Sequence, residues 1–186
     1  MLELSLHILD LLENSLEAGA TRIELIINEE LSADRLTVEV SDDGCGMDEE
    51  TLVRALDPFF TTRTTRRVGL GLPLFSAAAE LCNGELRVES QVGRGTKVTV
   101  TFQHSHIDRA PLGDIQSTLM ALLLAERPVD LHYLHRINGR AFEFDTAEIR
   151  KALGDVALSH LAARRWLLEF IGRGERELLE ETRGDS

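Results

Sequence analysis

The sequence predicts an α/β fold, because patterns typical of helices and of strands follow one another along the chain. Residues 3–18 have a mostly apolar surface with one polar stripe, as expected of a helix that covers a core. Residues 35–40 (RLTVEV) alternate apolar and polar side chains like a half-buried strand. Residues 74–82 form an apolar run that Asn83-Gly84 ends as a helix C-cap.

The polar stripe of the first predicted helix consists of His7, Asp10, Asn14 and Glu17, spaced by three, four and three residues. Such a stripe is most often a solvated face. This one also offers an amide and a carboxylate one turn apart, a pair that suits Mg²⁺ and a water molecule. Both interpretations are compatible with the spacing.

Asp42 lies at the end of the strand predicted over residues 35–40. Its carboxylate is able to accept a hydrogen bond from an exocyclic amino group. Gly44 and Gly46 would remove side chains where a flat ring must approach the backbone. Taken alone, this block is better explained by a plain Asp-Gly turn, which is the favoured interpretation.

The glycines that precede the helix at 74–82 predict an anion site. Gly69 and Gly71 would leave backbone N–H groups free at a helix start, where the partial positive charge favours phosphate. A single short glycine turn is common and is weak evidence. The segment 61–67 (TTRTTRR) has no apolar residue, so it is expected to close over a triphosphate, to be a mobile surface loop, or both.

Five blocks in this order resemble the GHKL superfamily, which includes gyrase-type, heat-shock-chaperone, histidine-kinase and MutL-type ATPases. Residues 13–25 and 42–47 are most similar to MutL-type proteins, whereas residues 57–63, 68–75 and 93–102 are most similar to histidine-kinase catalytic domains. The resemblance covers residues 1–104. It implies an ATP-binding two-layer α/β sandwich, in which helices cover one face of a mixed sheet.

The resemblance also implies a Mg·ATP site, in which Asn14 binds the magnesium ion and Asp42 holds the adenine amino group. Thr96 is expected near the base, Phe59 and Phe60 at the start of a lid, and the backbone of the glycine segment against the phosphates. The other binding residues that it implies are Ala18, Gly44, Gly46, Met47, Thr62, Arg63, Val68, Gly69, Leu70, Gly71 and Leu72.

The candidate general base departs from the hydrolytic members of the superfamily. They carry a glutamate four residues before the magnesium asparagine, where this chain has Asp10. An aspartate is one methylene shorter, and catalysis is sensitive to displacements of about one ångström. Glu13 is the alternative carboxylate, but it points about a quarter-turn away on the helix. We therefore expect slow hydrolysis at best.

A cation for the terminal phosphate is expected from an arginine. The chain has two lysines, Lys97 and Lys151, and Lys97 falls on the last strand predicted for the ATP-binding part. Arg63, Arg66 and Arg67 are better candidates for that charge.

Composition favours a cytoplasmic protein that binds neither nucleic acid nor membrane. The chain has 186 residues and a formal net charge of −12, from 32 acidic and 20 basic residues. No apolar stretch is long enough for a membrane span, and the first residues lack a basic signal-peptide region. Two cysteines argue against a disulfide framework. Cys45 is a candidate for a place near the base, but a buried free thiol is the favoured interpretation.

Residues 105–186 are expected to form a small α+β module after the ATP-binding domain at 1–104, with 103–111 as a linker. Asn138-Gly139 predicts a two-residue β-hairpin between two alternating runs. The predicted elements are a helix at 112–126, strands at 129–137 and 140–145, and helices at 146–153 and 158–171, followed by a charged tail.

The sequence leaves several functions open. The first hypothesis is a nucleotide-dependent switch, in which Mg·ATP and slow hydrolysis control a protein partner. The second is a stand-alone kinase that phosphorylates a histidine or serine of a separate protein, and the third is a nucleotide sensor that does not hydrolyse ATP. The family layout also suggests a subunit of a redox or hydrogenase-type complex as partner, and a homodimer is compatible with the sequence.

Overall fold

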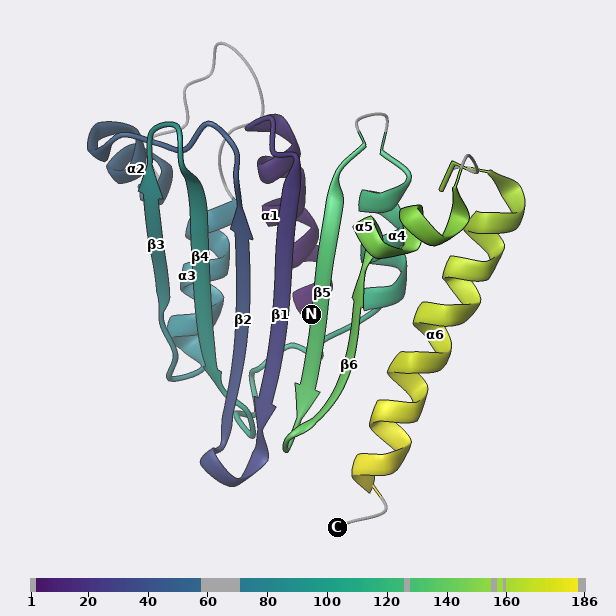
Figure 1. Cartoon of the computed structure of the whole chain (residues 1–186). Coiled ribbons are helices and arrows are strands. Elements are labelled where there is room, and N and C mark those ends of the chain that lie inside the picture. Colours follow the sequence, from purple (N-terminus) through teal and green to yellow (C-terminus); the bar gives the residue numbers. More distant parts are fainter. Residues whose placement is uncertain (1–2, 58–70, 126–127, 155–156, 159, 184–186) are drawn as a thin grey trace.

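A six-stranded sheet with helices packed on one face forms the molecule (Figure 1). The computed structural model describes residues 3–57, 71–125, 128–154, 157–158 and 160–183. The strands are β1 (Arg22–Glu30), β2 (Arg35–Asp42), β3 (Leu86–Gln91), β4 (Gly95–Gln103), β5 (Asp130–Ile137) and β6 (Arg140–Asp145). The helices are α1 (Leu4–Glu17), α2 (Glu49–Leu56), α3 (Gly71–Leu81), α4 (Ile115–Leu123), α5 (Thr146–Leu153) and α6 (Leu161–Arg183).

The strand order is β3-β4-β2-β1-β5-β6, and the sheet is mixed. β1 runs parallel to β5, while the other neighbouring strands are antiparallel. Helices α1, α3 and α4 lie behind the sheet in Figure 1. The predicted fold class, a mixed sheet covered by helices on one face, is confirmed.

Helix α1, strand β2 and the end of helix α3 form as their sequence patterns predict. On α1, Ile8 and Leu12 are fully buried against the sheet, and Val38 of β2 is fully buried on the face that meets them. Asn83 adopts a φ of 55° after α3. The Gly84 N–H donates to the Ala79 carbonyl at 2.9 Å, which is the predicted helix C-cap.

The second half of the chain continues the same sheet. In the parallel register, Ile23 lies beside Leu131 and Leu25 lies beside Tyr133, and all four side chains are fully buried. One hydrophobic core therefore extends under both halves of the sheet. The domain boundary at residue 104 stays a prediction, and the structure adds that residues on both sides of it share one sheet.

The β5–β6 hairpin turns at the predicted pair. Asn138 has a φ of 49° and Gly139 a φ of 85°, the two left-handed conformations that a tight two-residue turn requires. The Asn138 side chain also accepts a hydrogen bond from the Leu31 N–H at 3.0 Å. The turn thus ties the hairpin to the connection that follows β1.

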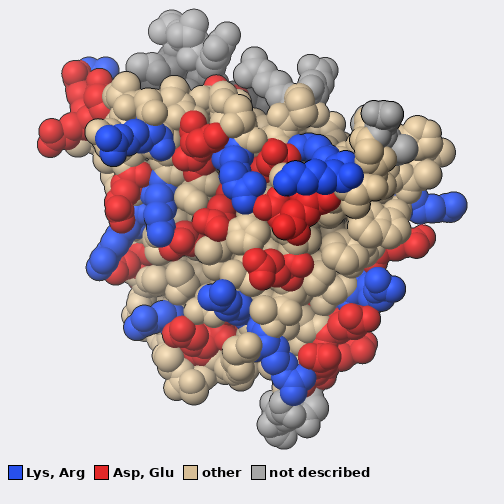
Figure 2. All heavy atoms as spheres, in the orientation of Figure 1, with Lys and Arg blue, Asp and Glu red and all other residues tan. Residues whose placement is uncertain are grey.

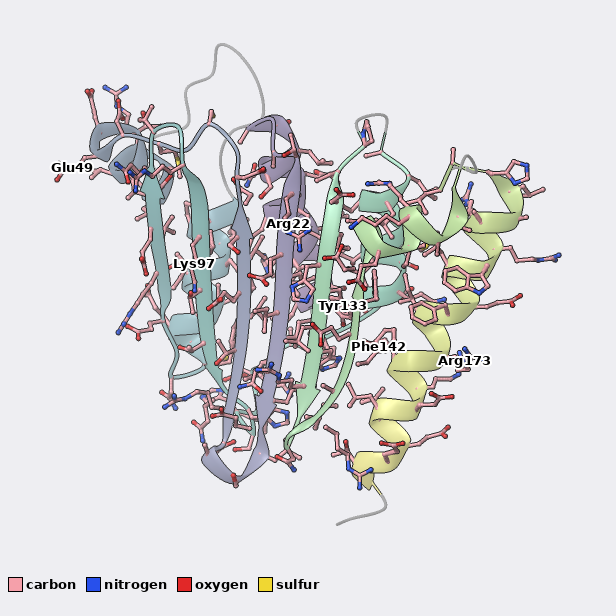
Figure 3. All side chains as sticks on the ribbon, in the orientation of Figure 1. Arg22, Glu49, Lys97, Tyr133, Phe142 and Arg173 are labelled. Atoms are coloured by element: carbon pink, nitrogen blue, oxygen red, sulfur yellow. The ribbon has the colours of Figure 1, made fainter. Side chains whose placement is uncertain are left out.

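The predicted end of the last helix at residue 171 is wrong, because α6 continues to Arg183. Gly172 and Gly174 suggest a helix end in the sequence, but in the structure they allow close packing. A Cβ on Gly174 would lie 2.1 Å from Phe142 Cε2, and one on Gly172 would lie 2.7 Å from Gln116 Nε2. Leu178, beyond both glycines, is buried and holds the last turns of the helix in place. Figure 3 shows Phe142 between β6 and α6.

The open face of the sheet is polar and is crossed by ion pairs. Lys97 pairs with Glu39 at 2.9 Å, and Arg22 of β1 pairs with Asp145 of β6 at 2.7 Å. Figure 2, which views this face, shows acidic and basic side chains interspersed. Among the described residues, no helix is both long and apolar enough to cross a membrane.

A buried chain of titratable side chains ties α6 to the sheet. His135 is 1% exposed; its Nδ1 lies 2.9 Å from Glu175 Oε2 of α6, and its Nε2 lies 3.0 Å from Glu29 Oε1 of β1. The Tyr133 hydroxyl donates to the other Glu175 oxygen at 2.8 Å. His104 Nε2 lies 2.6 Å from the other Glu29 oxygen. Burial alone would lower the pKa of His135, but its two carboxylate partners outweigh burial and raise that pKa to about 9.

The raised pKa of His135 predicts that the protein loses stability in mildly alkaline solution. A histidine whose pKa is raised on folding contributes fully below its unfolded value of 6.5, and the contribution is lost as pH rises through about 9. His132 adds a contribution of the same sign, because its pKa is also raised: burial lowers it, and Glu143 and Glu24 outweigh burial. We expect the free energy of unfolding to fall by roughly 2–3 kcal/mol across this range.

Urea denaturation at several pH values gives the slope of the free energy of unfolding against pH, in the wild-type protein and in His135→Gln. The variant should be less stable near pH 6.5 and should lose much of the slope. His160→Gln, at an exposed position, is the matched control and should keep the wild-type slope. An identical slope in His135→Gln and wild type would contradict the prediction.

Candidate nucleotide-binding site

A cavity of about 660 Å³ lies where α1, α2 and α3 meet the ends of β2 and β4. This volume is in the range of pockets that hold small ligands and cofactors. Its walls are largely apolar, with a few polar side chains that face inward. The lining residues are Leu11, Asn14, Ser15, Leu16, Glu17, Ala18, Val40, Asp42, Cys45, Gly46, Met47, Thr51, Ala55, Gly71, Leu72, Thr96, Val98 and Ala125.

Many of the residues predicted for the site lie around this cavity. Those that line it are Asn14, Ala18, Asp42, Gly46, Met47, Gly71, Leu72 and Thr96. Asp10, Glu13 and Gly44 are not in the lining. Phe59, Phe60, Thr62, Arg63, Arg66, Arg67, Val68, Gly69 and Leu70 lie outside the described residues. The binding and catalytic roles of all these residues stay proposals.

The two neighbouring aspartates at the end of β2 have different surroundings. Asp42 faces the cavity, and its Oδ2 accepts a hydrogen bond from Ser15 Oγ at 2.6 Å. Asp43 accepts from the Thr21 N–H at 2.8 Å and from the Arg22 N–H at 2.9 Å. Burial would raise the pKa of Asp43, but the hydrogen bonds from Thr21 and Arg22 outweigh it and lower that pKa. Asp43 thus fixes the start of β1, while Asp42 faces the cavity.

Thr96 sits beside Asp42 in the antiparallel pairing of β4 with β2. Its hydroxyl lies 2.8 Å from Ser90 Oγ of β3, which in turn accepts a hydrogen bond from the Met47 N–H at 2.8 Å. This group of hydrogen bonds joins β3, β4 and the corner after β2, formed by residues 43–47. It places one hydroxyl and one carboxylate side by side at the same end of the cavity.

The glycines of the corner are required by contacts within the protein. A Cβ on Gly44 would lie 2.8 Å from Ala18 Cβ of α1. Gly46 has a φ of 64°, and its Cβ would lie 2.0 Å from the Gln91 carbonyl oxygen. Packing therefore accounts for both glycines, whether or not a ring also approaches them. Ala18, with its short side chain, leaves room for this close approach of Gly44.

The opposite end of the cavity brings α1 against the start of α3. From the position that a Gly71 Cβ would occupy, Asp10 Oδ2 is 3.6 Å away and Asn14 Nδ2 is 3.9 Å away. Asp10 and Asn14 thus face the same glycine. An amide and a carboxylate one turn apart provide the oxygen ligands that Mg²⁺ accepts when phosphates and water complete its shell. The side chains present here fit that ion.

Other charged groups considered in the sequence are directed elsewhere. Asp10 and Glu13 are both exposed and outside the lining. Of the two, only Asp10 is among the groups nearest to Gly71, so the location of Glu13 does not favour it as the base. Lys97 pairs with Glu39 on the open face of the sheet. His7, the first member of the polar stripe, stacks on Phe75 of α3 with ring centroids 4.9 Å apart. Burial lowers the pKa of His7, and Asp10 partly offsets the effect.

The expectation that Cys45 is buried is wrong: the residue is exposed and lines the cavity. Hydrogen bonds to its backbone N–H and carbonyl fix the position of Cys45, and its side chain is left exposed. The Cys45 N–H donates to the Ala18 carbonyl at 2.9 Å, and its carbonyl accepts from the Gly93 N–H at 2.7 Å. Cys82 is the buried thiol, and burial raises its pKa.

Sequence reasoning missed Ser15 and the whole of α2. Ser15 occupies a position of the buried face of α1, where a serine between leucines is a signal for a partner inside the protein. α2 contributes Thr51 and Ala55 to the cavity. Its start is also readable, because Asp48 precedes two glutamates and caps the helix by accepting from the Thr51 N–H at 2.8 Å.

A mixed sheet with helices on one face, and a cavity between the ends of β2 and β4 and the start of α3, fits a nucleotide-binding protein of the α/β sandwich type. The family described as "Histidine kinase-, DNA gyrase B-, and HSP90-like ATPase" matches residues 2–106. The match covers more than half of the chain, so the chain belongs to this family. The predicted GHKL membership is confirmed, and it implies ATP binding, usually with Mg²⁺.

The similar curated proteins include sensor proteins and kinases. The sensor protein kinase FleS of Pseudomonas aeruginosa is 42% identical over 109 residues, 59% of this chain and 26% of that protein. A putative sensor protein of Shewanella frigidimarina is 34% identical over 97 residues, 51% of this chain and 15% of that protein. Sporulation kinase E of Bacillus subtilis is 33% identical over 95 residues, 50% of this chain and 13% of that protein. The chain therefore matches only a minor part of each relative.

Among solved structures, the N-terminal domain of a DNA repair protein has a similar fold, with a TM-score of 0.50 and 17% sequence identity. The similarity covers 76% of this chain and 51% of that one. At this identity it shows the fold alone. The covered share is larger than the stretch matched by the family, so part of the chain after residue 106 also belongs to the shared fold.

Asp42→Asn should weaken binding of adenine nucleotides. If Asp42 accepts a hydrogen bond from the adenine amino group, the substitution removes a charge-assisted hydrogen bond and costs about 1.5–3 kcal/mol, or roughly 10- to 150-fold in affinity. Isothermal titration calorimetry with Mg·ADP measures the loss. Asp43→Asn is the matched control: it should lower the melting temperature and leave the affinity of the folded protein nearly unchanged. Equal affinities of Asp42→Asn and wild type would exclude Asp42 as the adenine-binding group.

Proposed function

We propose that this protein binds Mg·ATP in the cavity between α1, α3 and the ends of β2 and β4. Asp42 accepts a hydrogen bond from the adenine amino group, and Thr96 lies beside it near the base. The apolar walls contact the faces of the ring. The observation that carries the proposal is the convergence of Asn14, Asp42 and Gly71 on one cavity in a chain that belongs to an ATPase family.

Asn14 would hold the magnesium ion at the phosphate end, with Asp10 next to it. The ion, when bound, neutralises phosphate charge and orients the terminal phosphate for transfer. Gly71 lets the start of α3 approach the two α1 side chains closely. The residues that would cover the phosphates, from Phe59 to Leu70, lie outside the described residues, so their roles stay predictions.

The use of ATP that the comparisons favour is phosphoryl transfer to a protein. In this proposal the γ-phosphoryl group moves from ATP to a side chain of a separate partner, and ADP leaves. Support comes from relatives named as a sensor protein kinase and a sporulation kinase, which are 42% and 33% identical over 59% and 50% of this chain. A redox-complex subunit as the partner stays a prediction from family layout.

A switch driven by slow hydrolysis is the second candidate, and the position of Asp10 favours it. This carboxylate is exposed and faces Gly71 beside Asn14, next to the end of the cavity where the phosphates are proposed to lie. A carboxylate there can take a proton from a water that attacks the γ-phosphate. ATP would then order the partner-binding surface, and hydrolysis would reset it.

Incubation with γ-labelled ATP and Mg²⁺ separates the two candidates. The protein is tested with proteins from its own cell extract, and free phosphate and labelled protein are followed separately. A labelled partner supports the kinase, and free phosphate without labelled protein supports the switch. Neither product, in a protein that binds ATP, would contradict both and leave a sensor.

Asp10→Asn should leave Mg·ATP affinity within about threefold and lower phosphate release at least tenfold, because the amide cannot take the proton of the attacking water. Release of inorganic phosphate under single-turnover conditions measures the effect. Glu13→Gln is the control, since Glu13 is exposed and away from the cavity, and it should hydrolyse ATP like wild type. Similar losses in the two variants would argue against Asp10 as the base.

A further inference from the structure

Ser15 is a polar side chain in the buried face of α1. Its side chain is 3% exposed, and its hydroxyl donates to Asp42 Oδ2 at 2.6 Å. Ser15 also contributes to the cavity lining beside Asn14. Neighbouring positions on this face are leucines and an isoleucine, so a serine here costs packing unless its hydroxyl is used.

The carboxylate of Asp42 is held from two sides. Gly44 N–H donates to Oδ1 at 2.9 Å, and Ser15 Oγ donates to Oδ2 at 2.6 Å. Two donors on different oxygens fix the rotation of the carboxylate plane. Each oxygen keeps further lone pairs, so the group can still accept a hydrogen bond from a ligand in the cavity.

The hydrogen of the Ser15 hydroxyl is committed to Asp42. Toward the cavity, Ser15 therefore presents lone pairs rather than a donor. The inner end of the cavity then offers two adjacent acceptors, one from α1 and one from β2. A ligand edge with an N–H donor matches this pattern, whereas an edge that lacks the donor leaves the acceptors without a partner.

We propose that Ser15 is a positioning residue that sets the selectivity of the cavity for purines with a 6-amino group. It acts through Asp42, by holding the carboxylate in the orientation that meets the amino N–H. The inference rests on the proposed function, since it concerns the same cavity and the same carboxylate. It assigns a share in base selection to Ser15, which is not among the binding residues that the resemblance implied.

The test compares two nucleotides that differ in one group. Mg·ADP carries the 6-amino group, and purine riboside 5′-diphosphate lacks it. Calorimetry on the full chain gives both dissociation constants for wild type and Ser15→Ala. We expect Ser15→Ala to weaken ADP binding about tenfold and purine riboside diphosphate binding less than twofold, so that the preference for ADP shrinks several-fold.

Two further variants separate positioning from a structural role. Ser5→Ala removes the other buried serine of α1, which is 2% exposed and bonds to Glu3 rather than to the cavity. It should lower stability about as much as Ser15→Ala and leave both affinities unchanged. Ser15→Thr keeps a hydroxyl donor and should restore the preference for ADP to within about twofold of wild type.

Each outcome is decisive. Equal losses for the two nucleotides in Ser15→Ala would show a merely structural role, and unchanged ADP affinity would show that Asp42 needs no help; either result overturns the proposal. Wild-type protein that binds neither nucleotide would overturn the proposed function itself. That failure is recognised before any variant is compared.

Discussion

The close approach of the corner after β2 to the turn between β3 and β4 is the constraint on which the site depends. Gly95 has a φ of 94°, and a Cβ there would lie 1.8 Å from the Asp42 carbonyl oxygen. A Cβ on Gly46 would lie 2.0 Å from the Gln91 carbonyl oxygen. No side chain fits between these backbones. Because these backbone segments are in contact, Asp42 and Thr96 lie next to each other at the cavity. The Asp42 carboxylate is then within hydrogen-bond distance of Ser15 on α1.

The second half of the chain supports this arrangement from the other side of β1. β5 adds a parallel strand next to it, and α4 packs on α1. Ala125, just after α4, reaches the cavity wall. Further away, the Glu29–His135–Glu175 chain joins β1, β5 and α6 through buried hydrogen bonds. Residues after the stretch that the family matches thus contribute to the cavity lining, through Ala125, and support β1 in the middle of the sheet.

Several residues that line the cavity were singled out from the sequence, by local patterns together with the resemblance to a known family. Asn14 and Asp42 follow from a polar stripe and a strand end, and both line the cavity. The Asn138-Gly139 hairpin was predictable because two left-handed residues admit few other structures. The hairpin depends on local sequence alone, whereas the choice of Asn14 and Asp42 also depended on the resemblance. Their ligand-binding roles still await the measurements described above.

The features that sequence reasoning missed depend on contacts between distant segments. Gly172 and Gly174 suggest a helix end until Gln116 and Phe142 are seen against them. Ser15 resembles any small helix residue until Asp42, 27 positions later, is placed beside it. The continuation of the sheet through β5 was equally hidden, because a parallel strand pair leaves no turn signal in the sequence.

The parallel pairing of β1 with β5 has a consequence for any shortened form of the chain. Eight positions of β1, from Arg22 to Glu29, are matched along β5. A fragment cut to the stretch that the family matches would leave that side of β1 as a bare sheet edge, with its N–H and C=O groups open to any passing strand. Such a fragment is expected to self-associate more readily than the whole chain, because β5 no longer pairs with β1.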